Sequence, residues 1–168
     1  MTIPVLLSLR RNDPETPLLF LTKSQFKPIL ERVPNLRVVP FYDKGTHKGL
    51  RGLWHLRRQL AEEPPQAIAD LHAVLRTKIL KTFLSGTGIP IKVLDKGRKE
   101  KRRLTSWKQK DFRPLKTTHE RYADVFRSLG YQISLTPQDI LPKEEWPPAF
   151  SRDWEGAISC RLGIAPFA

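Results

Sequence analysis

The chain has 168 residues, which suits one ordinary domain, and its hydrophobic content of 39% and charged content of 28% are typical of a globular protein. Its 30 Lys and Arg against 17 Asp and Glu give a formal net charge of +13, which favours polyanions such as nucleic acid, anionic lipid headgroups or sugar phosphates. The single cysteine, Cys160, excludes an internal disulfide and a multi-cysteine zinc site, and no apolar run reaches the length of a membrane span. We therefore expect a soluble, cytoplasmic protein.

Apolar runs and amphipathic stretches alternate along the chain. The first run, residues 3–9, has apolar side chains at helical spacing and predicts a short helix. The runs that predict strands are short and apolar, β-branched or aromatic: 17–22, 36–42, 66–72, 89–95 and 131–136. The stretches that predict helices are amphipathic or end at a glycine: 24–33, 49–63, 73–86 and 118–130.

This alternation with short links predicts an α/β fold with a mainly parallel, Rossmann-like sheet and flanking helices. Thr117 and Glu120 have the spacing of a capping box at the start of the last helix. The apolar face of the helix at 49–63 is expected to include Trp54. A domain over residues 1–136 and a proline-rich linker over 137–156 complete the predicted organisation.

The most charged part of the chain follows the fourth predicted strand. From Lys96 to Lys110 there are eight Lys or Arg and one Glu, so more than half of the formal net charge lies there. Such a run can be a nucleic-acid site, a membrane-surface patch, a pocket for a phosphorylated ligand, or a solvated loop. Trp107 is its only aromatic residue, fewer than a stacking nucleic-acid site usually has. Its place after a strand favours a phosphorylated ligand, because ligands bind at the carboxyl ends of parallel strands.

Asp70 and His72 lie at the end of the third predicted strand. Alternate residues of a strand point to the same face, so both side chains can reach one ligand there. Alternatively, Asp70 caps the following helix and His72 only packs. Arg76, one helical turn further on, adds a possible cation to the same rim. The sequence contains no P-loop, no metal-ligand spacing and no catalytic triad.

Five segments together resemble the N-terminal domain of glycosyltransferase family 9, the ADP-heptose:lipopolysaccharide heptosyltransferases and their relatives. In chain order they are MTIPVL, VPNLRVVPFYDKGTHKGLRGL, IADLHAVLRTKIL, IKVLDKGRKEKRRLT and LKTTHERYADVFRSLGY. The resemblance covers almost the whole chain. DLHxxLR, KGRKEK and KTTxERYADVF are fairly specific as an ordered set, whereas each alone is weak.

The resemblance implies a GT-B fold, in which two Rossmann-like halves enclose the active site. The N-terminal half binds the acceptor, the phosphorylated inner core of lipopolysaccharide, and the C-terminal half binds a nucleotide-sugar donor such as ADP-heptose. The implied reaction inverts the anomeric carbon without a metal or other cofactor, and an aspartate deprotonates the acceptor hydroxyl. Contact with the anionic inner-membrane surface, from its cytoplasmic side, is also implied.

The resemblance further implies that both ends of the enzyme lie outside this chain. The catalytic aspartate, on a first strand and its loop, is expected upstream of Met1, so no residue here is assigned as catalytic. Residues 157–168 resemble the beginning of the donor-binding half. We therefore expect the chain alone to be inactive and either poorly soluble or folded with the strands at 17–22 and 66–72 paired directly, because a central strand is missing.

On this reading one set of side chains contacts the acceptor. It comprises Asp70, His72, Arg76, Lys96, Arg98, Lys99, Lys101, Glu120 and Arg121, of which the Lys and Arg of the basic run meet core phosphates. The alternative hypothesis is a small, basic, nucleic-acid-binding α/β protein. A structural domain with a solvated basic loop is the third possibility.

Overall fold

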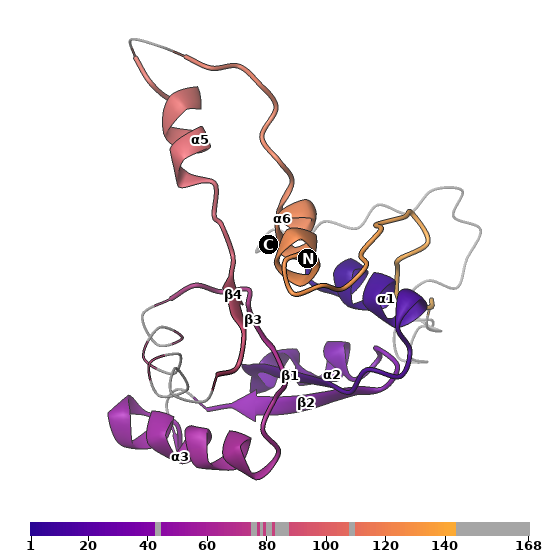
Figure 1. Ribbon diagram of the computed structural model, residues 1–168, viewed down its shortest axis with the longest axis vertical. Helices are drawn as coiled ribbons and strands as arrows, with labels where there is room; N and C mark the ends of the chain where they lie inside the picture. The colour runs from indigo at the N-terminus through magenta and orange to yellow at the C-terminus, as the bar shows by residue number, and fades with distance from the viewer. Residues whose placement is uncertain are drawn as a thin grey trace, which may run out of the picture.

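The structure is a computed structural model that describes residues 1–42, 45–74, 77, 79, 82, 88–107 and 110–143. Within these residues the fold is mixed α/β, with helices packed against short parallel strand pairs (Figure 1). The elements are α1 (Ile3–Asn12), β1 (Leu18–Lys23), the 3-10 helix η1 (Ser24–Phe26), α2 (Lys27–Leu30), β2 (Leu36–Phe41), α3 (Gly49–Glu62), β3 (Ile68–Asp70), β4 (Ile91–Val93), α5 (Arg98–Leu104) and α6 (Thr118–Arg127).

The described strands form two separate two-stranded sheets, not one continuous sheet. β1 and β2 are parallel, with Leu18 opposite Leu36, and β3 and β4 are parallel, with Ile68 opposite Ile91. The prediction of parallel pairing is therefore confirmed. β1 and β3 do not pair with each other, so the expected direct pairing of these two strands is wrong.

The two sheets nevertheless share one apolar core. Its buried centre comes mainly from α1 and α6, with Val5, Leu6 and Leu9 against Ala123 and Phe126. Alternate strand residues pack on this centre, as expected for side chains on one face of a sheet. They are Leu18 and Phe20 of β1, Leu36 and Val38 of β2, and Ala69 at β3. Both strand pairs thus contribute to the core whose centre these two helices form.

The helix α3 packs in a second, smaller cluster. Its Leu53 and Leu56 are buried against Phe41, with Leu21 of β1 beside them. Leu21 and Phe41 alternate with the residues that face the first core, so α3 covers the opposite side of the β1–β2 pair. Trp54 is half exposed and stacks with Arg58, whose Cζ lies 5.2 Å from the ring centroid, so its expected place on the apolar face is wrong.

Residues 131–136 do not form the predicted last strand. They pack instead against α1, where Ile133 is buried. The hydroxyl of Ser8 donates to the carbonyl of Ser134 at 2.9 Å and accepts from its amide at 3.1 Å, so a side chain satisfies the backbone groups that a ladder would have used.

The segment after residue 136 also contacts α1. Asp139 is 3% exposed, accepts from the amide of Thr136 at 2.7 Å and forms an ion pair with Arg11. The described part of the predicted linker, up to residue 143, therefore begins packed on the body. The rest of that linker, the predicted second domain from residue 157 and most of the predicted helix at 73–86 lie outside the described residues.

Candidate functional site

The strand β3 ends in a turn that its last residue shapes. Oδ1 of Asp70 accepts from the amides of His72 and Ala73, at 3.0 and 2.8 Å. Ala73 has a φ of 48°, a left-handed conformation that non-glycine residues adopt only where other contacts hold it. One carboxylate oxygen of Asp70 is thus engaged in the turn, and His72 is exposed beside it.

The neighbouring strand β4 ends in a similar way. Oδ1 of Asp95 accepts from the amide of Gly97 at 2.9 Å, and Gly97 has a φ of 61°. The amide of Leu94 donates to the carbonyl of Asp70 at 2.9 Å and extends the pairing of the two strands by one residue. Two turns of similar construction therefore leave the same edge of the sheet.

A lysine joins these two turns. Nζ of Lys96, on the β4 turn, donates to the carbonyl of Ala73, on the β3 turn, at 3.2 Å. The structure therefore brings Asp70, His72 and Lys96 to one edge of the β3–β4 sheet, as predicted for residues that lie at the carboxyl ends of parallel strands. Arg76, expected on the same rim, lies outside the described residues.

The helix α5 begins directly after the β4 turn and carries the other predicted cations. Arg98, Lys99 and Lys101 are exposed, and no residue of α5 is buried. Figure 1 shows α5 standing away from the sheets and the other helices. Its cations therefore meet solvent on several sides instead of lining an enclosed cleft.

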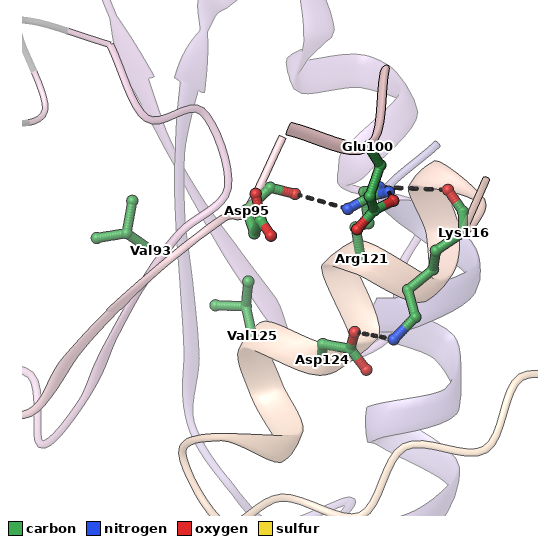
Figure 2. A pocket seen from close by; sticks show the side chains of 7 residues that line it. All are labelled: Val93, Asp95, Glu100, Lys116, Arg121, Asp124 and Val125. Atoms are coloured by element: carbon green, nitrogen blue, oxygen red, sulfur yellow. Dashed lines mark hydrogen bonds and ion pairs between the residues drawn. The ribbon is translucent and has the colours of Figure 1, made fainter. Parts of the chain in front are cut away.

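Arg121 is placed differently from the other predicted cations. It is 8% exposed, and its guanidinium donates to the carbonyl of Lys116 at 3.2 Å and, at a longer 3.5 Å, to the carbonyl of Asp95 (Figure 2). It also forms an ion pair with Glu100 of α5. Arg121 thus connects α6 to the β4 turn and to the basic helix, which makes it a positioning residue in this structure.

Glu120, the other predicted site residue on α6, forms hydrogen bonds with residues at the two ends of that helix. Its amide donates to the hydroxyl of Thr117 at 3.2 Å, which confirms the Thr117 cap. Its carboxylate accepts from Arg127 at 2.7 Å, two turns further along. Its side chain is partly exposed and lies at the start of α6, one residue before Arg121.

A half-open pocket lies between β4, α5 and α6 (Figure 2). Its lining residues are Val93, Asp95, Glu100, Lys116, Arg121, Asp124 and Val125. Lys116 donates to Asp124 at 2.5 Å, and Arg127 donates to the other carboxylate oxygen at 3.0 Å. The hydrogen bond from Lys116, with a smaller contribution from Arg127, lowers the pKa of Asp124 below its ordinary value.

Sequence reasoning missed Glu100, Lys116 and Asp124 as members of this region. The spacing of Glu120, Asp124 and Arg127 on one helix face was a usable signal for the pairs within α6. The contacts of Glu100 and Lys116 with α6 depend on how the chain returns from α5, for which the sequence carries no local signal.

Neither a metal site nor a membrane span is evident in the described part of the chain. No three His, Cys, Asp or Glu residues there lie close enough together to hold a metal ion. No helix among the same residues combines the length and apolar character needed to cross a bilayer.

Comparison with protein-family models, with curated proteins and with solved structures finds no match to this chain.

Proposed function

We propose that this chain is the acceptor-binding half of an inverting, metal-independent glycosyltransferase of the GT-B type. Its acceptor would be a phosphorylated carbohydrate of the lipopolysaccharide core, and the sugar, heptose or a related one, would come from a nucleotide-sugar donor such as ADP-heptose. The support is the motif set described above together with one structural observation. That observation is the meeting of the β3 and β4 turns, where Lys96 donates to the carbonyl of Ala73 at 3.2 Å.

This arrangement suits an anionic, hydroxyl-rich ligand. The second carboxylate oxygen of Asp70 and the exposed imidazole of His72 offer hydrogen-bonding groups for sugar hydroxyls at the carboxyl end of the sheet. Lys96 and the first turn of α5 place cations next to them, and Lys and Arg both bind phosphate oxygens well. Polar recognition and charge recognition would therefore be divided between the β3 turn and α5.

The cations of α5 are available for such a ligand. Within the described part of the chain, Lys99 and Lys101 have no acidic partner, while the one acidic residue of the helix, Glu100, is paired with Arg121. The pairing with Glu100 holds the start of α5 near the sheet edge. Arg121 would accordingly act on the acceptor through α5 and not by direct contact.

Binding of a phosphorylated core oligosaccharide to the full chain tests this proposal. Charge reversal at Lys99 and Lys101 (Lys99→Glu with Lys101→Glu) should weaken binding of the phosphorylated oligosaccharide by about tenfold or more, because two charge-assisted contacts are lost. Binding of the same oligosaccharide after dephosphorylation should change little. Arg51→Glu with Lys143→Glu is the matched control, since both residues are exposed, lie outside the proposed site and change the net charge equally.

Equal losses in the two double variants would show that only the overall charge matters and would contradict the proposed site. Strong binding to random DNA or RNA that falls steeply with salt, with no binding to the oligosaccharide, would favour the nucleic-acid alternative.

A further inference from the structure

The segment from α5 to the approach to α6 forms a projection, and the carbohydrate site explains only its first residues, up to Lys101. We call residues 98–107 and 110–113 the basic arm. Figure 1 shows the arm leaving the sheet edge after β4, running outward through α5 and returning to α6. It is attached at its base through Arg121, whose guanidinium meets Glu100 and the carbonyl of Asp95.

The two most exposed large hydrophobic side chains of the described residues both lie on this arm. Trp107 is 93% exposed and Phe112 is 79% exposed. The amide of Asp111 donates to the carbonyl of Arg103 at 3.3 Å, so the returning chain lies against the end of α5. Both aromatic residues are therefore held near the C-terminal end of that helix, far along the projection.

Cations accompany these aromatic side chains, and few of them are neutralised. Arg102, Arg103 and Lys110 are exposed close in sequence to Trp107. The acidic residues of the described arm already have partners, because Glu100 pairs with Arg121 and Asp111 pairs with Arg113 at 2.7 Å. The far end of the arm thus combines a strong positive charge with exposed aromatic rings.

We propose that the basic arm docks on an anionic lipid bilayer, with Trp107 and Phe112 entering the headgroup region and the surrounding Lys and Arg contacting lipid phosphates. Aromatic rings favour the boundary between headgroups and acyl chains, and each cation near an anionic bilayer adds affinity. Two kinds of contact, apolar and electrostatic, are what a reversible surface anchor requires.

The shape of the arm favours a bilayer over a nucleic acid. Single-stranded nucleic acid is usually held in a groove, with successive bases stacked on aromatic side chains. The described residues of the basic arm project from the rest of the structure, and none of those in α5 is buried, so they line no groove of that kind. A projecting segment with exposed aromatic and cationic side chains suits a broad planar surface.

The inference rests on the proposed function in one respect: a glycolipid acceptor would bring the protein close to a membrane. The residues are different ones: Trp107 and Phe112 for the bilayer, Lys99 and Lys101 for the core phosphates. Vesicles that contain no saccharide therefore test the anchor separately. Failure of vesicle binding with intact oligosaccharide binding would remove the anchor alone, and the reverse result would remove the proposed function alone.

The experiment is co-sedimentation of the full chain with vesicles of phosphatidylglycerol and phosphatidylethanolamine, compared with phosphatidylcholine vesicles. We expect binding to the anionic vesicles only. Trp107→Ala with Phe112→Ala should weaken this binding about tenfold or more, because two aromatic side chains lose apolar burial. Arg102→Gln and Arg103→Gln should each weaken it about fivefold. Phosphorylated oligosaccharide binding should remain unchanged in the aromatic variant.

A second measurement locates the tryptophan. Lipids with brominated acyl chains should quench the fluorescence of the chain, and Trp107→Phe should remove most of that quenching while retaining binding. Trp54→Phe, at another exposed tryptophan on α3, should leave the quenching in place. Equal binding by the wild type and the aromatic variant, or quenching that persists in Trp107→Phe, would overturn the proposal. So would steeply salt-dependent binding to RNA without any binding to anionic vesicles.

Discussion

Gly97 leaves the space that the guanidinium of Arg121 occupies. A Cβ at residue 97 would lie 2.4 Å from Cζ of Arg121, which is far inside van der Waals contact. Gly97 also has a φ of 61°, the left-handed conformation that glycine adopts without strain. The absence of a side chain at this one residue therefore permits both the turn after β4 and the contacts of Arg121 with Lys116 and Glu100.

Replacing Gly97 tests this relationship. Gly97→Ala should destabilise the protein by about 1–3 kcal/mol, because the new methyl group adds backbone strain and displaces the guanidinium. Gly88→Ala is the matched control, since Gly88 has a φ of 72° but no atom near its would-be Cβ. Urea denaturation should show a larger loss for Gly97→Ala, and trypsin should cleave the basic arm faster. Equal losses in the two variants would mean that the contact with Arg121 contributes little.

The hydroxyl of Ser8 should be important for stability although serine is a small residue. Ser8 is fully buried, and Ser8→Ala leaves the amide of Ser134 without its partner while Arg11 still donates to the carbonyl of Ser134 at 2.6 Å, so we expect a loss of about 1–2 kcal/mol. Ser128→Ala removes a single, more exposed hydroxyl bond to the carbonyl of Val125 at 2.7 Å. Chemical denaturation should therefore show a clearly smaller loss for that control. A loss no larger than the control's would show that water replaces the Ser8 hydroxyl.

The buried carboxylate of Asp139 should connect the end of the described chain to α1. Asp139→Ala leaves the amide of Thr136 unsatisfied and Arg11 without its ion-pair partner, so the free energy of unfolding should fall by about 2–3 kcal/mol. Arg11→Gln should cost less, because Arg11 is 41% exposed and Thr136 still satisfies the carboxylate. If removing Asp139 has no effect, the segment after residue 136 does not pack on α1 in solution.

The ion pairs of Asp124 predict a dependence of stability on acid. Because Lys116 and Arg127 lower its pKa in the folded protein, its contribution is present above the ordinary pKa of an aspartate, near 4. That contribution is lost as the pH falls through the lowered folded value. Asp124→Asn should reduce stability at pH 7 by about 0.5–1 kcal/mol, a range suited to a 43% exposed carboxylate, and flatten the stability curve below about pH 4.

Asp111→Asn is the control for this titration. Arg113 lowers the pKa of Asp111 to about 2, a large shift, but the Arg113 side chain is 82% exposed and the two residues are only two apart. Such a pair also forms in the unfolded chain, so the two states are affected alike and stability should not change measurably. Thermal melts from pH 2.5 to 7 on both variants would contradict this reasoning if Asp111→Asn had the larger effect.

Much of the local structure was predictable because its causes are local. Apolar runs such as 18–23 and 36–41 placed β1 and β2, and Thr117 marked the start of α6 with a side-chain cap. The convergence of Asp70, His72 and Lys96 also followed from a local argument, since each lies just past a parallel strand. These predictions needed only periodicity, capping and the direction of the strands.

Predictions that depended on distant partners were less successful. The run 131–136 has the composition of a strand, but the amide and carbonyl of its Ser134 bond to Ser8, more than a hundred residues earlier. Arg10, for which the sequence predicted no role, lies in the last turn of α1, is 7% exposed and donates to the carbonyls of Pro14 and Thr16. Burial lowers the pKa of Arg10, and nothing in the neighbouring sequence indicates that burial.

The shared core has a consequence for how the protein folds. β1–β2 and β3–β4 each pair strands that are consecutive along the chain, so their formation closes shorter loops than the packing of α1 against α6. α1 and α6, which form the buried centre of the core, come from opposite ends of the described chain. Because of the loop-closure entropy, we expect the packing of α1 against α6 to be the slow step of folding. Each strand pair alone has only marginal stability. Loss of α1 by proteolysis should therefore unfold both sheets together, including the β3–β4 pair, which begins more than fifty residues after α1 ends.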